Sequence, residues 1–177
     1  WMIEKHTQRP QKLNVWAGIF GSQVVRPFFI EGNLNSVQYL AMLRNQIIPT
    51  LQNIAGDNFG TLWFQQDGAP PHFGVEIRRH LNHVFPGKWI GRRGAIEWPA
   101  RSPDLSPLDY YFWGYLKDQV YRTKPQDLVE LRLRIVEEAA RIPVDAIRNA
   151  LSAFYHRLGY CQEAEGKQFG HLLYQFR

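Results

Sequence analysis

Cysteine is almost absent from this sequence of 177 residues. The single cysteine, Cys161, excludes a disulfide bond within the chain and suits a reducing compartment. Long apolar runs are also missing: none approaches the roughly 20 residues of a membrane-spanning helix, and no signal-peptide pattern precedes the first predicted strand. We find no internal repeat and no low-complexity segment. With 45% hydrophobic and 14% aromatic residues, the sequence predicts a folded chain with its own core and no membrane partner.

Acidic residues are scarce in one part of the chain, which makes the charge distribution uneven. The formal net charge is +5, and the window from Arg78 to Arg101 contains six basic residues and one acid, Glu97. This window alone therefore carries a charge of +5. A basic block of this kind suits contact with a nucleic-acid backbone, and a solvated loop is the alternative interpretation. The candidates for phosphate contacts are Lys88, Arg92, Arg93 and Arg101.

Hydrophobic patterns divide the chain into strands and helices. Alternating apolar residues predict an antiparallel hairpin of strands over 13–20 and 24–30, and Pro27 indicates an edge or a bulge in the second strand. A helix is predicted to begin at Asn35 or Ser36, with Pro49 bending its last turns. The other predicted elements are a strand ending at Asp67, a helix over 73–85, a basic loop over 86–94, a strand over 95–98, a helix over 109–121, and later helices that are separated at Pro143.

Two acids stand at the ends of predicted elements. Asp67 follows the buried strand, and the prolines at 70 and 71 stop that strand, so Asp67 lies at its C-terminal end. Open sheets flanked by helices bind ligands at that end. Asp109 opens an aromatic helix, and two carboxylates from separate elements suit an oxygen-preferring metal ion. The alternatives are that Asp67 caps the following turn and that Asp109 interacts favourably with the helix dipole.

Two strings around these acids resemble the catalytic core of the mariner/Tc-type transposases, members of the DDE superfamily with a ribonuclease H-like fold. The first is Q-Q-D-G-A-P-P-H over 65–72, and the second is W-P-A-R-S-P-D-L-S-P-L-D-Y over 98–110. The resemblance implies that Asp67 and Asp109 are the second and third catalytic acids. It also implies that they bind Mg²⁺, for which Mn²⁺ can substitute.

The fold that the resemblance implies is an α/β ribonuclease H-like mixed sheet flanked by helices. Such a fold has three strands before its first helix, whereas this sequence predicts two. We therefore expect the chain to lack the first strand and the first acid, because neither Glu4 nor Glu31 falls within a predicted strand. Residues 1–124 would form the catalytic core, and residues 125–177 would form C-terminal helices packed on the same domain.

The function that the resemblance implies is metal-dependent DNA cleavage and strand transfer in cut-and-paste transposition. The expected partner is DNA, at transposon ends and target, with a homodimer in the full-length protein and a nuclear location. Without its first acid, the fragment is expected to be inactive. One alternative is a relic or a host-adopted module that binds DNA or protein without catalysis. A further alternative is a different ribonuclease H-like nuclease, against which the S-P-D-L-S-P-L-D string speaks.

Four other features have more than one interpretation. His72 is a candidate for a contact to phosphate or water, for proton transfer, or for a structural hydrogen bond at a helix start. Asp104 competes with Asp109 but is expected to cap the helix through its carboxylate. His80 and His83 are assigned to a polar helix face. The aromatic residues are expected in the core rather than in base stacking: Trp98, Tyr110, Tyr111, Phe112 and Trp113.

Overall fold

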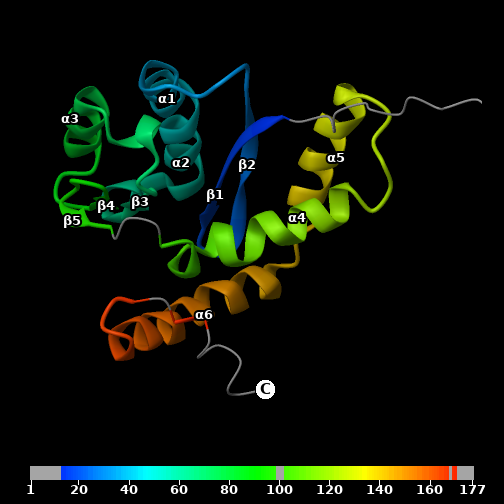
Figure 1. The fold of residues 1–177 in the computed structure, drawn as a ribbon. Helices are drawn as coiled ribbons and strands as arrows, with labels where there is room; N and C mark the ends of the chain where they lie inside the picture. Colours follow the sequence, from blue (N-terminus) through cyan, green and yellow to red (C-terminus); the bar gives the residue numbers. More distant parts are fainter. Residues whose placement is uncertain (1–12, 99–101, 168, 171–177) are drawn as a thin grey trace, which may run out of the picture.

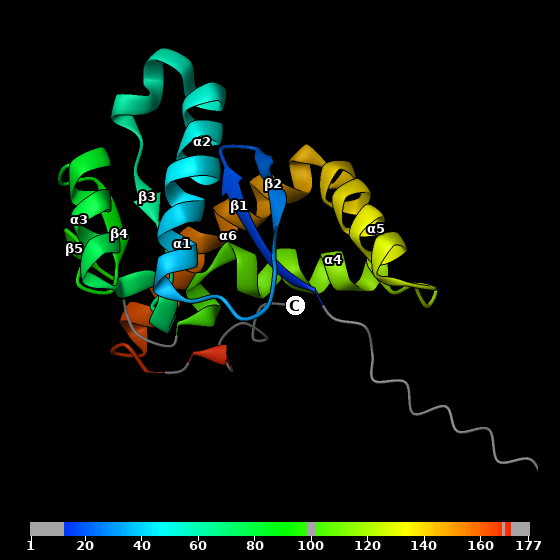
Figure 2. The same cartoon turned by 90° about the horizontal axis from the view of Figure 1, so that it is seen from above.

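The computed structural model describes residues 13–98, 102–167 and 169–170. A hairpin stands between two helices on one side, α1 and α2, and two on the other, α4 and α5, while a short parallel sheet lies next to α3 (Figures 1 and 2). Helix α6 runs below the hairpin in Figure 1. The elements are β1 (Asn14–Phe20), β2 (Gln23–Ile30), α1 (Ser36–Met42), α2 (Ile48–Ala55), β3 (Phe64–Gln65), α3 (Val75–Val84), β4 (Trp89–Gly91), β5 (Ile96–Glu97), α4 (Trp113–Val120), α5 (Leu128–Arg141) and α6 (Val144–Glu163).

The hairpin forms as the alternating pattern predicts. Strands β1 and β2 pair antiparallel, and the register shifts between Trp16 and Gly18. Ala17 therefore lies opposite two residues of β2, Arg26 and Pro27. Because proline has no N–H to contribute to a ladder, a bulge is a position that tolerates it. The prediction of an edge or a bulge at Pro27 is confirmed.

The two faces of the hairpin pack into different hydrophobic cores. Val25 and Phe28 join a core with α1, α2 and α3, in which Trp89 is completely buried. The opposite face carries Val15, Ala17 and Ile19, which the sequence places together, and it packs against α4 and α5. The hairpin is thus held by apolar contacts on both sides.

The helix after the hairpin has the predicted start and an unpredicted middle. The Asn35 side chain accepts a hydrogen bond from the Gln38 backbone N–H at 2.9 Å, and the Gln38 side chain accepts from the Asn35 backbone N–H at 3.0 Å. This reciprocal pair is a capping box. A π-helical segment, Leu43–Ile47, then joins α1 to α2 ahead of Pro49. Since Pro49 cannot donate an α-helical hydrogen bond, the wider turn accommodates it.

The predicted basic loop over 86–94 is wrong in its centre. Strand β4 lies within it and pairs parallel with both β3 and β5, so the short sheet has the order β3-β4-β5 in the described part of the chain. Trp89 anchors this strand, and its indole N–H donates to the Asn82 side-chain oxygen at 2.7 Å. The strand has only three residues, too few for an alternating pattern to reveal it.

The C-terminal half is helical, as the sequence predicts. A π-helical segment, Leu108–Phe112, leads into α4, so the predicted helix begins one residue before Asp109. Pro143 stands at the N-cap of α6 and separates that helix from α5. Within the described residues, no helix combines the length and the apolar character needed to cross a membrane. The division into residues 1–124 and 125–177 stays a prediction.

Candidate active site

A cavity of about 510 Å³ lies between the open edges of β1 and β3. In the part of the chain that the structure describes, these two strands belong to separate sheets and do not pair. The cavity is lined by residues 15–20 from β1, by residues 62–67 around β3 and by residues 106–109 before α4. Both predicted acids, Asp67 and Asp109, are among the lining residues. The structure therefore brings the two acids to one cavity.

Asp67 is placed by the end of β3. The last backbone hydrogen bond of that strand runs from the Gln66 N–H to the Ile90 carbonyl at 3.0 Å. The next residue, Asp67, accepts from the Ala69 N–H at 3.0 Å through Oδ1, which is the turn-capping role expected of aspartate. The same oxygen lies 2.5 Å from His72 Nδ1. Among the described residues, Oδ2 has no hydrogen-bond partner, so the capping role leaves half of the carboxylate for a ligand.

The surroundings of Asp67 favour its ionised form. Burial acts to raise the pKa of Asp67, but the hydrogen bond and charge of His72 and the Ala69 N–H outweigh it and lower the pKa below its ordinary value. The Asp67 side chain is 55% exposed, whereas that of His72 is only 14% exposed. An ionised, accessible carboxylate is the form that binds a cation.

Asp109 is placed by the turn before α4. Its backbone N–H donates to the Ser106 carbonyl at 2.9 Å. Burial raises the pKa of Asp109, a hydrogen bond from the Ser106 side chain acts in the opposite direction, and the negative charge of Asp67 raises the pKa further. The charge of Asp67 thus reaches Asp109 across the cavity. A cation between the two carboxylates would relieve this repulsion.

The two carboxylates fit a divalent metal ion only in part. Their oxygen chemistry suits Mg²⁺ or Mn²⁺. Within the described residues, however, no group of three or more His, Cys, Asp or Glu side chains is arranged to hold a metal ion. His80 and His83 accordingly acquire no further ligand there. The arrangement brings two carboxylates to one cavity, and a metal ion bound there would need further ligands from elsewhere.

Two residues beside Asp67 were not predicted from the sequence. Gln66 is only 6% exposed, and its side-chain oxygen accepts from the Tyr39 hydroxyl at 2.9 Å. Its side-chain NH₂ donates to the His72 backbone carbonyl at 2.7 Å. Strand periodicity could have indicated that Gln66 is buried, because alternate residues of a strand point to the same face. Phe64 is buried, Gln65 is exposed and Gln66 is buried. No local pattern could have indicated Tyr39, because it comes from α1.

The predicted phosphate-contact residues do not form one group. The chain leaves β4 at Gly91, so Arg92 and Arg93 follow the same end of the parallel sheet as Asp67. The Arg92 guanidinium lies over the Phe73 ring at 4.0 Å, beside the turn that follows Asp67. Lys88 precedes β4 at the opposite end, where its ammonium group donates to the Gly60 carbonyl at 2.8 Å. Arg101 lies outside the described residues.

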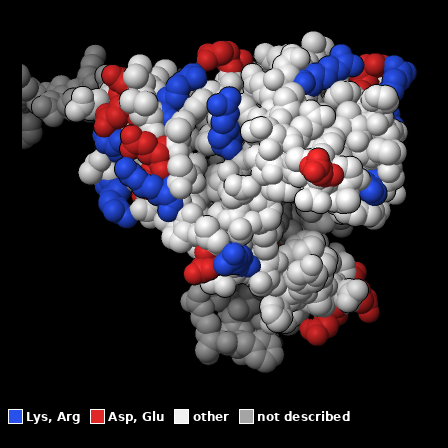
Figure 3. Space-filling model, turned by 180° about the vertical axis from the view of Figure 1, so that it is seen from behind, with Lys and Arg blue, Asp and Glu red and all other residues white. Residues whose placement is uncertain are grey.

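The surface charge is mixed on the face seen from behind. Figure 3 shows blue and red side chains interspersed over a largely uncharged surface, without a continuous basic stripe on this face. At the edge formed by α5, ion pairs join neighbouring turns of the helix, including Arg134 with Glu130 and Arg141 with Glu138. Arg134 and Arg141 are thus paired within their own helix, whereas Arg132 of α5 pairs with Glu31, which follows β2.

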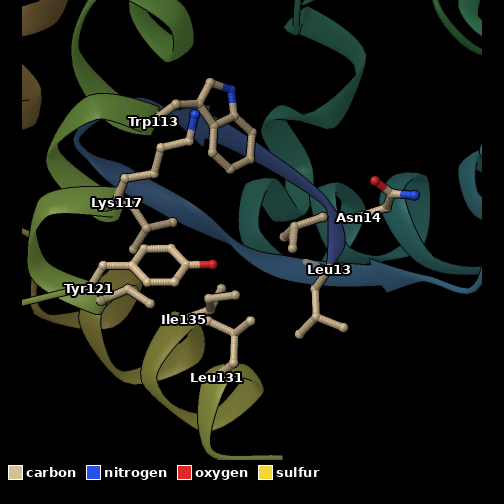
Figure 4. A pocket seen from close by; sticks show the side chains of 10 residues that line it. Leu13, Asn14, Trp113, Lys117, Tyr121, Leu131 and Ile135 are labelled. Carbon is tan, nitrogen blue, oxygen red and sulfur yellow. The ribbon is translucent and has the colours of Figure 1, made fainter. Parts of the chain in front are cut away.

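A second, smaller cavity differs in character. It has a volume of about 280 Å³ and lies between α4, α5 and the start of β1. Figure 4 shows Leu131 and Ile135 with Trp113, Tyr121 and Lys117 around it. No acid is among its lining residues, so it provides no carboxylate for a metal ion.

The structure also shows the positions of Asp104 and of the aromatic residues that the sequence analysis considered. The prediction that Asp104 caps the helix is wrong, because the helical segment begins after Pro107 without a side-chain cap. Instead, the Asp104 backbone carbonyl accepts from Arg157 at 2.9 Å. The expected core position of the aromatic residues is confirmed for Phe112 and Trp98, which are buried.

Sequence comparison finds relatives among curated transposases. The chain is 26% identical over 147 residues to the Tc3 transposase of Caenorhabditis elegans, a match that covers 81% of this chain and 41% of the relative. It is 27% identical over 156 residues to the Tcb1 transposase of Caenorhabditis briggsae, covering 86% of this chain and 52% of the relative. The chain thus spans about half the length of these relatives or less. No protein-family profile matches it.

Comparison with solved structures shows the fold. The catalytic domain of Mos1 transposase, solved with raltegravir and Mn, matches with a TM-score of 0.72 and 18% identity, covering 89% of this chain and 82% of that domain. The Mos1 mariner paired-end complex with Mn matches with a TM-score of 0.73 and 20% identity, covering 96% of this chain and 51% of that one. The described chain therefore has the mixed α/β, ribonuclease H-like fold of the Mos1 domain. The chain is therefore similar in sequence to transposases of the Tc1/mariner type, and it shares the fold of the catalytic domain of Mos1 transposase.

Proposed function

We propose that this chain provides the core of a metal-dependent site for cutting and joining DNA in cut-and-paste transposition. The observation that carries the proposal is the meeting of Asp67 and Asp109 in one cavity, with the charge of one raising the pKa of the other. Their origins, the end of β3 and the turn before α4, are the two motifs that resemble the family. Paired carboxylates of this kind support phosphodiester chemistry.

In this proposal, Asp67 and Asp109 hold Mg²⁺, with Mn²⁺ as a substitute. Bound divalent ions supply positive charge that stabilises the attacking and leaving oxygens of a phosphodiester. The contribution of the chain is to present one ionised carboxylate, Asp67, in a fixed orientation beside a second one. His72 holds Oδ1 of Asp67 through Nδ1 and so orients the carboxylate rather than moving a proton. The Mos1 domain has been solved with Mg and with Mn, which supports the choice of metal.

The same proposal assigns the first acid to a strand that is not among the described residues. The supporting observation is the cavity itself, since it separates β1 from β3 and both strands face it. A strand between them would pair with both edges and join the two sheets into one. On its own, the chain would then have two of three acids and would cut DNA poorly or not at all.

We base the proposed partners on the solved structures of Mos1 transposase. Mos1 structures include a paired-end complex with a transposon end and a strand transfer complex. We infer DNA as the partner of this chain, with Arg92 and Arg93 contacting phosphates at the end of the sheet that carries Asp67. A homodimer of the full-length protein and a nuclear location belong to the same proposal.

A Mn²⁺ titration of the chain followed by tryptophan fluorescence tests the metal site, because Trp63 and Trp113 line the same cavity. We expect saturable binding that is lost in Asp67→Ala and in Asp109→Ala. The matched control is Asp104→Asn, which lies in the same turn region and should bind as the wild type does. Binding that is indifferent to Asp67 and Asp109 would overturn the proposal.

The alternative is a module that binds DNA or protein without catalysis. The observation that favours it is that, within the described residues, no three His, Cys, Asp or Glu side chains are grouped so that they could hold a metal ion. The two functions differ in a plasmid-nicking assay with Mn²⁺ on the full-length protein. Nicking that Asp67→Ala abolishes supports the endonuclease, and DNA binding without nicking supports the module.

A further inference from the structure

A buried chain of hydrogen bonds leads from α1 to the carboxylate of Asp67. The Tyr39 hydroxyl bonds to Gln66 Oε1 at 2.9 Å, and Gln66 Nε2 bonds to the His72 carbonyl at 2.7 Å. His72 Nδ1 then bonds to Asp67 Oδ1 at 2.5 Å. Tyr39 is completely buried, and Gln66 is the one buried polar side chain in the described part of the chain apart from tyrosine. The network thus joins residues up to 33 positions apart in the sequence, from Tyr39 in the core to His72 at the rim of the cavity.

The direction of each hydrogen bond is fixed by chemistry. An indole N–H can only donate, so the hydrogen bond between Trp16 and Tyr39 uses the tyrosine oxygen as acceptor and leaves its O–H for Gln66. Burial and the negative charge of Asp67 raise the pKa of Tyr39, and the Trp16 bond has a smaller opposing effect, so the hydroxyl keeps its proton. Gln66 Oε1 therefore accepts, and its NH₂ group must point toward the His72 carbonyl.

This orientation fixes the position of the His72 ring. The His72 backbone is held at both ends, because its N–H donates to the Ala69 carbonyl at 2.8 Å and its carbonyl accepts from Gln66. The ring lies against the Tyr39 ring, with centroids 4.2 Å apart. Asp67 Oδ1 also accepts from the Ala69 backbone N–H, and we assign it the acceptor role toward His72 as well, so that Nδ1 of His72 carries the proton of this bond.

We propose that Tyr39 and Gln66 are positioning residues for Asp67, acting through His72. They hold the imidazole so that it binds one carboxylate oxygen and leaves the other for a divalent cation; this inference rests on the proposed function. A glutamine side chain buried among apolar residues is costly unless both of its ends are bonded, and an apolar residue would fill the same space. The network therefore has a role in orientation that packing alone does not require.

The test uses Tyr39→Phe and Gln66→Met, each with a matched control. Tyr155→Phe removes a hydroxyl from a 75% exposed tyrosine, and Gln52→Met changes an exposed glutamine of α2 that does not line the cavity. The first readout is the tautomer of His72 in the metal-free chain, measured by long-range ¹H–¹⁵N NMR at alkaline pH, where histidine rings are neutral. The second is Mn²⁺ affinity, measured by tryptophan fluorescence.

We expect His72 to carry its proton on Nδ1 in the wild type and in both controls. In Tyr39→Phe and Gln66→Met the proton should shift toward Nε2, and Mn²⁺ affinity should fall about tenfold, the usual size of an effect from beyond the direct ligands. Thermal unfolding identifies the variants that remain folded. If Gln66→Met does not fold, Tyr39→Phe decides, since it removes a single oxygen.

The outcomes separate this inference from the proposed function. A wild-type tautomer and wild-type affinity in folded Tyr39→Phe would overturn the inference. A changed tautomer with unchanged affinity would overturn it too, because His72 would then be positioned without consequence for Asp67. If the wild type binds no Mn²⁺, or Asp67→Ala binds as well as the wild type, the proposed function fails, and the role in orienting a metal ligand fails with it even where the tautomer changes as expected.

Discussion

The antiparallel hairpin and the parallel sheet of this protein are built in different ways. Strands β1 and β2 have seven and eight residues, and their side chains fill apolar cores on both faces. Strands β3 and β5 have two residues each, and the end of β3 is held by the polar contacts of Gln66 and His72. The hairpin depends on many interchangeable apolar contacts, whereas the site depends on a few specific ones. Point changes in the two regions should therefore have separable effects on stability and on metal binding.

The largest effect is expected on the hairpin side, from Leu131→Ala in α5. Leu131 is completely buried in the core between the hairpin, α4 and α5. Its truncation should lower the free energy of unfolding by about 2–5 kcal/mol through lost burial and the cavity that remains. Urea unfolding followed by circular dichroism measures this change.

The control for Leu131→Ala lies on the same helix. Leu133 is 58% exposed, so Leu133→Ala should change the free energy of unfolding by no more than about 0.5 kcal/mol. Folded Leu131→Ala should also keep its Mn²⁺ affinity, since the residue does not line the cavity with Asp67. Equal destabilisation by the two substitutions would contradict the assignment of Leu131 to the core.

The next effect is expected in the parallel sheet, from Gly94→Ala. A methyl group on Gly94 would lie 2.9 Å from Trp89 ring carbons and 3.1 Å from the Gly91 nitrogen, both closer than normal contact. Moving a buried tryptophan against β4 should cost about 1–3 kcal/mol of stability. It should also weaken Mn²⁺ binding, because β4 supports the end of β3. The comparison with Leu131→Ala then separates loss of stability alone from loss of stability with loss of the site.

Gly60→Ala is the matched control for Gly94→Ala. No heavy atom lies within 4 Å of a methyl group placed there, so stability and metal affinity should remain close to wild type. Thermal unfolding and the Mn²⁺ titration measure both properties on the same samples. A Gly94→Ala variant as stable as Gly60→Ala would show that β4 and its turn can shift without cost.

The difference in length between the hairpin strands and the strands of the parallel sheet explains how much of the fold could be predicted from the sequence. Long alternating strands and amphipathic helices carry their own periodicity, so the hairpin, α3 and the helix that includes α4 were predicted close to their observed bounds. The separation of α5 from α6 at Pro143 was predicted as well. Strand β4 was missed because three residues show no period and because basic residues surround it. Its burial depends on the Trp89 side chain, whose surroundings come from distant elements.

The residues of the candidate site could also be predicted only in part. Asp67 and Asp109 were predicted because each stands in a motif at the end of an element, and the structure brings both to one cavity. Lys88 and Arg92 were both predicted to contact phosphate, and the sequence did not show that strand β4 places them at opposite ends of the parallel sheet. Tyr39 could not be predicted, because its contact with Gln66 joins positions 27 residues apart.

In metal-free protein, Asp67 and Asp109 are expected to contribute to folding stability with opposite dependence on pH. The pKa of Asp67 is lowered in the folded state, so its contribution to stability is present above the unfolded pKa and is lost as pH falls through the folded one. The pKa of Asp109 is raised, so the folded state binds the extra proton and stability falls as pH rises between the unfolded and folded values. At neutral pH, Asp67→Asn should therefore destabilise the protein and Asp109→Asn should stabilise it.

Thermal melts in a chelator from acidic to neutral pH measure this prediction. The difference between Asp67→Asn and wild type should shrink on the acidic side, where Asp67 is protonated in both folded and unfolded chains. The difference for Asp109→Asn should shrink there as well, with the opposite sign. Two variants that shift the melting temperature in the same direction at neutral pH would contradict the opposite pKa shifts of the two acids.

The smallest effect is expected within the basic residues, where Arg92→Ala and Lys88→Ala compare the two ends of the parallel sheet. If DNA approaches the end that carries Asp67, Arg92→Ala removes one phosphate contact, and the slope of log affinity against log salt should fall by about one unit. Lys88→Ala should leave the slope unchanged, because its ammonium group bonds to Gly60 at the other end. Fluorescence anisotropy with a labelled duplex at several salt concentrations measures both slopes. A smaller slope for Lys88→Ala than for Arg92→Ala would place the DNA at the end of the sheet remote from Asp67, where neither acid could reach a phosphodiester.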